Sequence, residues 1–204
     1  MGAKFEKVKR FENEDIQMPS RATANSAGYD LYVAEDTVIP SLFERIYNSL
    51  DFRIRGPLYT PPIHSLSEAA FNIKIEDMRP TLVSTGVKCK LDPGTYLELS
   101  VRSSTPLKYL LILANGVGIV DADYYGNPDN DGEIFLQLIN LGPNPVILRK
   151  GDRIGQGIIK PYLITEDDVA TGERLGGFGS TSVSLIDENF VFRPINSLYW
   201  LGCC

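Results

Sequence analysis

Two aspartates follow an apolar run in GVGIVDADYYGN, residues 116–127. A carboxylate is ionised at neutral pH and, if well positioned, can act as a general base. Asp121 and Asp123 stand two positions apart, so an ideal strand would place both on one face. Asn115, earlier in the same segment, adds an amide that can donate and accept hydrogen bonds. The sequence that follows, YYGNPDNDG, is typical of a turn, so turn aspartates in a hairpin are the other interpretation. The residue types alone leave both interpretations open.

Two further stretches carry groups that suit an anion such as phosphate. In GERLGGFGSTS, residues 172–182, glycine amides can form an anion-binding nest, and Arg174 adds a fixed positive charge. No Gly-Lys-Ser/Thr follows, so this is not a Walker loop, and flexible loops often have the same composition. In VRSSTPL, residues 101–107, one charge and two hydroxyls gather at a strand end, on Arg102, Ser103 and Ser104. Each stretch by itself is also compatible with an ordinary loop.

An aspartate in SAGYDLYVAED, residues 26–36, is unusual for its position. Asp30 stands among Tyr29, Leu31 and Tyr32 in a predicted strand, where aspartate is disfavoured. A lone acid makes a poor metal cage. It could still anchor Mg²⁺ through water, because Mg²⁺ keeps several waters and takes its other ligands from substrate phosphates.

The elements that must position these groups are predicted to be strands. In TYLELSV, residues 95–101, Leu97, Leu99 and Val101 share one face, which is the period of a half-buried strand. Similar runs continue from Thr81 onward, broken by Gly, Pro and Asn at intervals of roughly ten residues. The pattern predicts an all-β sandwich or barrel.

Residues 41–80 depart from this rhythm. SLFERIYNSL has the apolar stripe of a short helix, and Ser41 with Glu44 makes a capping-box pattern. Farther along, residues 71–75 alternate like a strand. The segment is too small to bury a core alone, so we interpret residues 1–182 as one domain with an insertion at about 41–80. Residues 183–204 form an apolar tail extension that could pack on the body or on a neighbouring subunit.

Composition narrows the classes of partner. The chain has 204 residues, 43% apolar, which is enough for a sizeable core. A net charge of −6 without a basic patch argues against nucleic-acid binding. The longest apolar stretch is too short to span a bilayer, and the charged first residues are unlike a secretory signal. Cys89, Cys203 and Cys204 make an odd set without framework spacing, which predicts a reducing, cytoplasmic location.

Taken in order, these stretches resemble the five motifs of the trimeric deoxyuridine triphosphatase (dUTPase) family. AGYDLYVAED is similar to the first motif, RSST to the second and LANGVGIVDADYYG to the third. GDRIGQ is similar to the fourth and GGFGST to the fifth. The resemblance covers about residues 15–40 and 81–182, and the ordered set is far more specific than any single member.

The resemblance implies a jelly-roll-like β subunit in a homotrimer, with each active site shared between chains and closed by the C-terminal arm. The implied reaction converts dUTP and water to dUMP and pyrophosphate with the help of Mg²⁺, keeping uracil out of DNA and supplying dUMP. If the chain is viral, the expected location is the host cytoplasm.

The resemblance also implies roles for individual residues. Asp121 matches the general base, Tyr124 the ring beneath the deoxyribose, Phe178 the ring that stacks on uracil, and Asp30 the acid that holds Mg²⁺ through water. The residues that match the uracil-reading hairpin are Asn115, Gly118, Ile119 and Val120. Those that match phosphate contacts are Arg102, Ser103, Ser104, Gln156, Arg174, Gly179, Ser180 and Thr181.

The sequence departs from the family pattern in three places. Arg174 is one residue closer to Phe178 than is usual, and Ser182 stands where a glycine commonly does. NPDNDG, residues 127–132, lengthens a hairpin that is usually tight. The insertion at 41–80 has no counterpart in the compact pattern.

Two alternatives follow from the same residues. The related dCTP deaminases share the fold and an RSS motif, but they have a second arginine and a glutamate where this chain has Leu107 and Gln137. Without that glutamate a base for deamination is missing. The other alternative is a regulatory protein of dUTPase fold that binds a protein partner through residues 41–80, a role compatible with catalysis.

Overall fold

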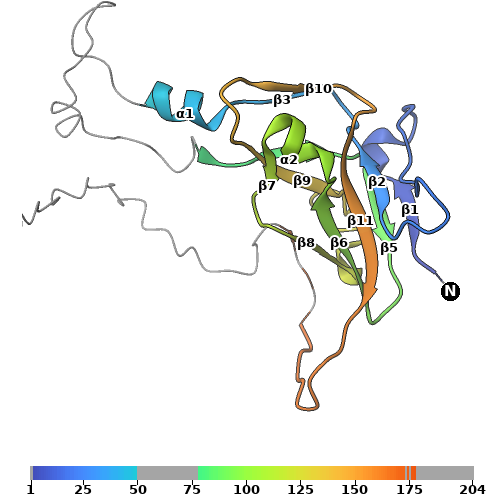
Figure 1. Cartoon of the computed structure of the whole chain (residues 1–204). Coiled ribbons are helices and arrows are strands. Elements are labelled where there is room, and N and C mark those ends of the chain that lie inside the picture. Colours follow the sequence, from blue (N-terminus) through green and yellow to red (C-terminus); the bar gives the residue numbers. More distant parts are fainter. Residues whose placement is uncertain (1, 50–77, 173, 175, 178–204) are drawn as a thin grey trace, which may run out of the picture.

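The computed structural model describes residues 2–49, 78–172, 174, 176 and 177 (Figure 1). This part of the chain consists mostly of strands with short helical segments, which confirms the all-β prediction. The strands are β1 (Lys4–Lys7), β2 (Tyr29–Tyr32), β3 (Thr37–Ile39), β4 (Thr81–Ser84), β5 (Val87–Lys90), β6 (Thr95–Val101), β7 (Leu111–Leu113), β8 (Gly118–Asp121), β9 (Phe135–Asn140), β10 (Val146–Leu148) and β11 (Arg153–Pro161). The helical segments are η1 (Lys9–Phe11), α1 (Leu42–Ser49), α2 (Ser104–Tyr109) and η4 (Ala122–Tyr124).

The strands pair antiparallel in a four-stranded sheet, a three-stranded sheet and two ribbons. The larger sheet has the order β2-β11-β6-β8 and the smaller β4-β9-β7, while β1 pairs with β5 and β10 with β3. The long strand β11 lies between β2 and β6 (Figure 1). Gln156 on β11 stands opposite Asp30 on one side and Ser100 on the other. The first and fourth sequence motifs therefore meet on one sheet, and the second follows directly after β6.

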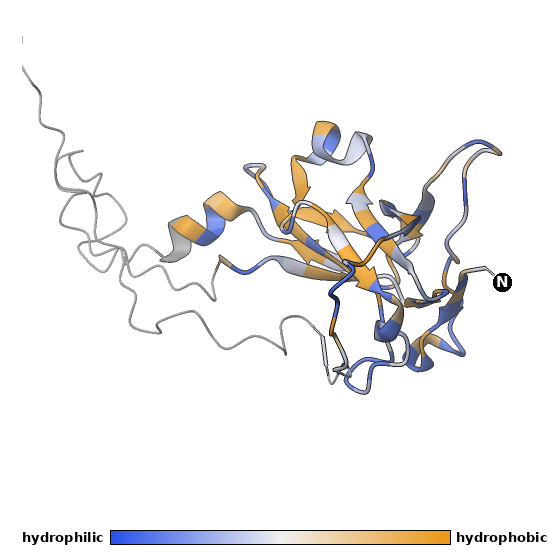
Figure 2. Cartoon of the chain, turned by 90° about the horizontal axis from the view of Figure 1, so that it is seen from below, coloured by the Kyte–Doolittle hydropathy of each residue, from blue (hydrophilic) through white to orange (hydrophobic). Residues whose placement is uncertain are grey.

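The core lies beneath these strands, where apolar residues concentrate (Figure 2). Leu97 and Leu99 of β6 are both buried, as their alternation predicts. Burial of each such side chain contributes roughly 1.5–3 kcal/mol. A Cβ at Gly155 of β11 would lie 2.6 Å from Leu136 Cδ1, and one at Gly157 would lie 2.9 Å from Leu97 Cδ1. The strand that carries Gln156 thus rests directly on the core.

The start of the insertion is tied to the body of the domain. The predicted helix is present as α1, and the Ser41 hydroxyl accepts a hydrogen bond from Glu44 N at 3.4 Å. The same hydroxyl, fully buried, donates to Gly142 O at 2.6 Å. Ser41 therefore caps the helix and attaches it to the loop after β9. The predicted strand at 71–75 and the tail 183–204 lie outside the described residues, so a partner role for the insertion stays a prediction.

No helix in the described part of the chain is long and apolar enough to cross a membrane.

Candidate active site

Asp30, on the edge strand β2 of the larger sheet, lies between two arginines. Arg102 Nε is 3.0 Å from one carboxylate oxygen and Arg153 Nη1 is 3.4 Å from the other. Asp30 is buried, whereas the Arg153 side chain is half exposed. Because two cations share one carboxylate, the cluster keeps an excess of positive charge where phosphates could bind.

Sequence reasoning did not select Arg153. Strict alternation along β11 would place its side chain on the face opposite to Gln156, away from Asp30. The register between β11 and β2 shifts between Arg153 and Gly155, and such a bulge re-aims side chains. The ion pair with Asp30 results. The available signal was the arginine inside GDRIGQ, but its direction depends on the bulge.

The predicted phosphate-binding hydroxyls, on Ser103 and Ser104, directly follow Arg102 in the sequence. Ser103 precedes α2 and makes no side-chain capping bond, so its hydroxyl is not used to hold the helix. Thr105 Oγ1 donates to Ile154 O at 3.4 Å, which joins α2 to β11. Gln156 Nε2 donates to Ser100 Oγ at 3.2 Å. The second and fourth motifs are therefore held together by contacts across the sheet.

The two aspartates of the opening run converge on one arginine. Asp121 ends β8, Asp123 lies in η4, and both carboxylates pair with Arg174. Arg174 Nε is 2.8 Å from Asp123 Oδ1, and this hydrogen bond is the main cause that raises the pKa of Arg174. Asp121 keeps about half of its side chain exposed (49%). The two acids lie in different elements, and Arg174 bridges them.

A pocket of about 170 Å³ opens beside Asp121. Its lining includes the residues matched to nucleoside recognition, Asn115, Gly118, Ile119, Val120 and Tyr124, together with Asp121. A Cβ at Gly118 would lie 3.0 Å from Leu99 Cβ, so the lack of a side chain lets β8 lie close on β6. A wider hollow of about 630 Å³ lies on the other side, and Ile119, Asp121 and Arg174 line both. Asp121 thus stands at the boundary between two cavities.

Tyr124 forms one wall of this pocket and is itself buried. Burial is the main cause that raises the pKa of its phenol. The Arg174 guanidinium carbon lies 5.9 Å from the ring centroid, and a Cβ at Gly177 would lie 3.0 Å from Tyr124 Cε2. The described part of the C-terminal arm therefore lies against the ring. Phe178, Gly179, Ser180 and Thr181 lie outside the described residues.

The carboxylates around the pocket have different environments. Of the described residues that line it, only Asp121 and Glu133 are acids. Glu133 is 1% exposed, and its carboxylate accepts hydrogen bonds from Arg10, Ser84 and Gly86 N. Gln137, at the position that would distinguish a deaminase, contributes an amide to the lining. Asp121 is the acid that remains open to a water molecule.

A metal ion held by protein ligands alone does not fit the described residues. They contain no group of three or more His, Cys, Asp or Glu that could hold one. Asp30 is a single carboxylate with both oxygens paired to arginines. A carboxylate has further lone pairs, and Mg²⁺ bound to phosphates and water needs only a water-mediated contact. The donor set therefore fits a cation that arrives with a nucleotide.

The turn after Tyr124 depends on a glycine. Gly132 has φ +79°, and a Cβ there would lie 2.6 Å from Tyr124 O. We expect Gly132→Ala to lower the free energy of unfolding by about 2 kcal/mol or more, because the left-handed backbone cost of about 1–2 kcal/mol adds to a clash with backbone. Gly126→Ala is the matched control, since its φ is +76° and nothing lies within 4 Å. Equal losses in urea denaturation would contradict the close contact.

Comparisons with known proteins agree with this geometry. The family model described as dUTPase matches residues 66–182. The deoxyuridine 5'-triphosphate nucleotidohydrolase of Lactococcus lactis is 36% identical over 179 residues, covering 87% of this chain and 95% of the relative. The enzyme of the same name from Hydrogenobaculum is 31% identical over 175 residues, covering 83% of this chain and 93% of the relative.

Solved structures give the same result. The crystal structure of dUTPase from Streptococcus mutans matches with a TM-score of 0.59 and 34% identity, covering 79% of this chain and 98% of that one. A mutant dUTPase from phage phi11 of S. aureus, described for its coordination of a structural Mg(II) ion, matches with a TM-score of 0.54 at 16% identity. It covers 83% of this chain and 97% of its own, and at that identity the likeness concerns the fold alone.

Proposed function

The chain belongs to the dUTPase family, and on that basis we propose that it hydrolyses dUTP to dUMP and pyrophosphate. The observation that carries the proposal is the position of Asp121, half exposed beside a pocket whose walls include the residues matched to nucleoside recognition. A carboxylate so placed can orient a water molecule toward a phosphate that extends from the pocket.

The proposed reaction is one displacement. The water oxygen forms a bond to the α-phosphorus, its proton passes to Asp121, and the bond from the α-phosphorus to the bridging oxygen breaks to release pyrophosphate. Arg102 and Arg153, both fixed by Asp30, would stabilise the negative charge that develops on the phosphates. When bound with the nucleotide, Mg²⁺ would neutralise phosphate charge, with Asp30 contacting it through water.

Arg174 has a second part in this proposal. Because it pairs with both Asp121 and Asp123, it fixes the direction of the Asp121 carboxylate while no phosphate is present. A bound triphosphate would compete for the guanidinium and free an oxygen of Asp121 for water. Asp123 would then serve to retain the arm rather than to take a proton.

Release of pyrophosphate and of ammonia, measured in parallel with dUTP, dCTP, dTTP and UTP, tests the proposal. We expect pyrophosphate from dUTP in large excess over the other nucleotides, and no ammonia from dCTP. Ammonia release would favour the deaminase alternative, which the buried and paired Glu133 and the amide of Gln137 disfavour.

We also propose that three chains assemble around shared sites. Leu82 of β4 stands opposite Gln137 of β9, and Ile112 of β7 stands opposite Ile139, so these residues share the outer face of the smaller sheet. Leu82 and Ile112 are 46% and 37% exposed, and Gln137 also lines the pocket. An apolar face that continues into the pocket suits a site at a subunit boundary.

Light scattering is expected to give the mass of three chains for the wild-type protein. Ile112→Glu should shift the mass toward one chain, because it places a charge in the proposed interface. Val169→Glu, a change at an 86% exposed loop residue, should leave the mass unchanged. A monomeric wild-type protein would contradict the shared-site arrangement.

The cysteine pattern supports a cytoplasmic location, which we propose as well. Cys89 is a free thiol, and burial raises its pKa to about 12, so it stays protonated and unreactive at neutral pH.

A further inference from the structure

The hydroxyl of Tyr124 is held by the long turn that follows it in the chain. Asn130 Nδ2 donates a hydrogen bond to the hydroxyl at 2.7 Å, and the hydroxyl donates to Glu133 O at 3.2 Å. The hydroxyl thus accepts one hydrogen bond and donates another with its single proton. The ring is fixed from its far end by residues that a tight hairpin would lack.

The amide of Asn130 has a fixed orientation. Its Oδ1 accepts a hydrogen bond from Gly132 N at 3.0 Å, which leaves Nδ2 directed toward Tyr124. The Asn130 carbonyl also accepts from Glu133 N at 3.1 Å. Both the side-chain and the backbone carbonyl of Asn130 are therefore bonded within the turn, which leaves its Nδ2 for the Tyr124 hydroxyl.

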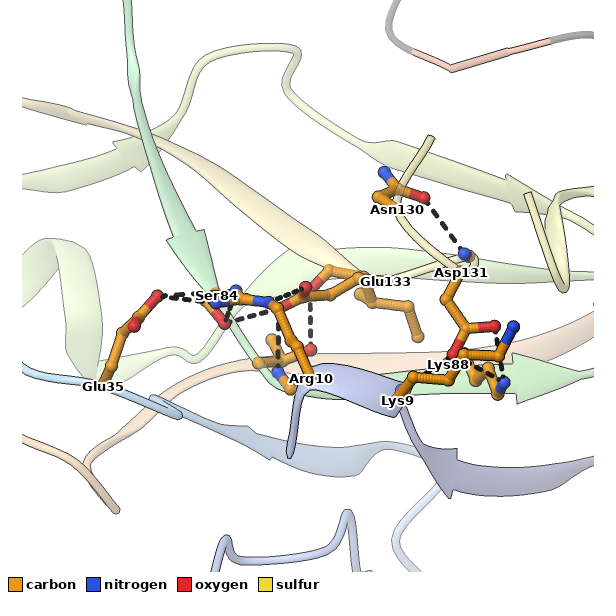
Figure 3. A network of polar contacts seen from close by, with 12 residues as sticks. Lys9, Arg10, Glu35, Ser84, Lys88, Asn130, Asp131 and Glu133 are labelled. Atoms are coloured by element: carbon orange, nitrogen blue, oxygen red, sulfur yellow. Dashed lines mark hydrogen bonds and ion pairs between the residues drawn. The ribbon is translucent and has the colours of Figure 1, made fainter. Parts of the chain in front are cut away.

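The segment that carries Asn130 is anchored to the N-terminal segment and to β5 (Figure 3). The Asp131 carboxylate accepts from Lys9 N and from Lys88 Nζ, each at 2.9 Å. The Glu133 carboxylate pairs with Arg10 through two bonds of 2.7 and 2.8 Å. Asp131 and Glu133 follow Asn130 closely in the sequence, so the turn cannot shift as a whole without breaking an ion pair.

We infer that Asn130 is a positioning residue that sets how strictly the site excludes ribonucleotides, by keeping the Tyr124 ring in place beneath the sugar. This inference rests on the proposed function. A ring held at its hydroxyl cannot retreat to admit an additional 2'-hydroxyl, because a packed interior transmits displacement to its neighbours. Without the bond from Asn130, only the longer contact to Glu133 O would remain. The kcat/KM for UTP would then rise relative to the kcat/KM for dUTP.

The test compares kcat/KM for dUTP and UTP in Asn130→Ala, Tyr124→Phe and the double variant. We expect Asn130→Ala to lower the dUTP-to-UTP ratio by about fivefold to tenfold, as for loss of one hydrogen bond. Tyr124→Phe removes that bond together with the contact to Glu133 O, so it should lower the ratio at least as much. The double variant should show the ratio of Tyr124→Phe, because the Asn130 amide has no hydroxyl left to hold. Tyr124→Phe leaves the bond between Asn130 and Gly132 intact, so it tests the tether even if Asn130→Ala fails to fold.

Asn127→Ala is the matched control. Asn127 is buried in the same turn, and its side chain accepts from Asp129 N without contacting Tyr124 through that side chain. Its ratio should equal that of the wild type. A folded Asn130→Ala or Tyr124→Phe variant that hydrolyses dUTP with the wild-type ratio would overturn the inference alone. A wild-type protein that turns over no dUTP would overturn the proposed function and this inference with it.

Discussion

Replacing Asp121 by Asn is expected to lower the turnover of dUTP by about 100-fold or more, because an amide cannot take the proton of the attacking water. The fold should survive, since Asp121 is about half exposed and the amide oxygen can still accept from Arg174. Nucleotide affinity should change little for the same reason. Steady-state release of pyrophosphate at saturating dUTP, with binding measured by calorimetry, gives both quantities.

Asp123→Asn is the control that separates catalysis from retention of the arm. It removes the other carboxylate that pairs with Arg174 and leaves the proposed base in place. We expect a several-fold effect at most. Near-normal turnover in Asp121→Asn, or equal losses in the two variants, would contradict the assignment of Asp121 as the base.

Replacing Arg10 by Met is expected to lower the free energy of unfolding by about 3 kcal/mol. Glu133 is 1% exposed, and Arg10 supplies two of the hydrogen bonds to its carboxylate. Removal of the cation leaves a buried negative charge with only the hydroxyl of Ser84 and the amide of Gly86 as donors. We place the loss at the low end of the range for broken buried pairs because Arg10 itself is 46% exposed.

Urea unfolding at one protein concentration measures this loss, since the stability of an oligomer depends on concentration. Arg149→Met is the matched control, because the pair between Arg149 and Asp36 has both side chains more than half exposed. Exposed pairs contribute about 0.2–1 kcal/mol, so this variant should unfold almost as the wild type does. A loss for Arg10→Met that is no larger than the control would show that Glu133 does not depend on its partner.

Local sequence patterns predicted the local structure well. The alternation of Leu97 and Leu99 gave the buried face of β6, and the Ser41 cap gave the start of α1. Both follow from residues that are close in sequence and from periods fixed by the backbone. Several residues of the pocket could be named from the sequence because Asn115 and the run that ends at Asp121 form one continuous segment.

What the sequence could not predict are contacts made across long separations. Arg153 reaches Asp30 only because β11 contains a bulge, which no alternation pattern encodes. The pair of Arg10 with Glu133 joins residues 123 positions apart. The bridging of Asp121 and Asp123 by Arg174 likewise depends on how the arm returns over the site. Physical chemistry says that such charges need partners, but tertiary structure selects them.

The absence of side chains at Gly155 and Gly157 has a consequence for engineering the interior of the protein. β11 is at once the strand that carries Gln156 and the layer in contact with Leu97 and Leu136. A larger core residue at either leucine would press on this strand and displace the side chains on its other face. Attempts to make the protein more heat-resistant by repacking its interior would therefore have to be screened for turnover at every step, because interior volume and active-site alignment cannot be changed independently.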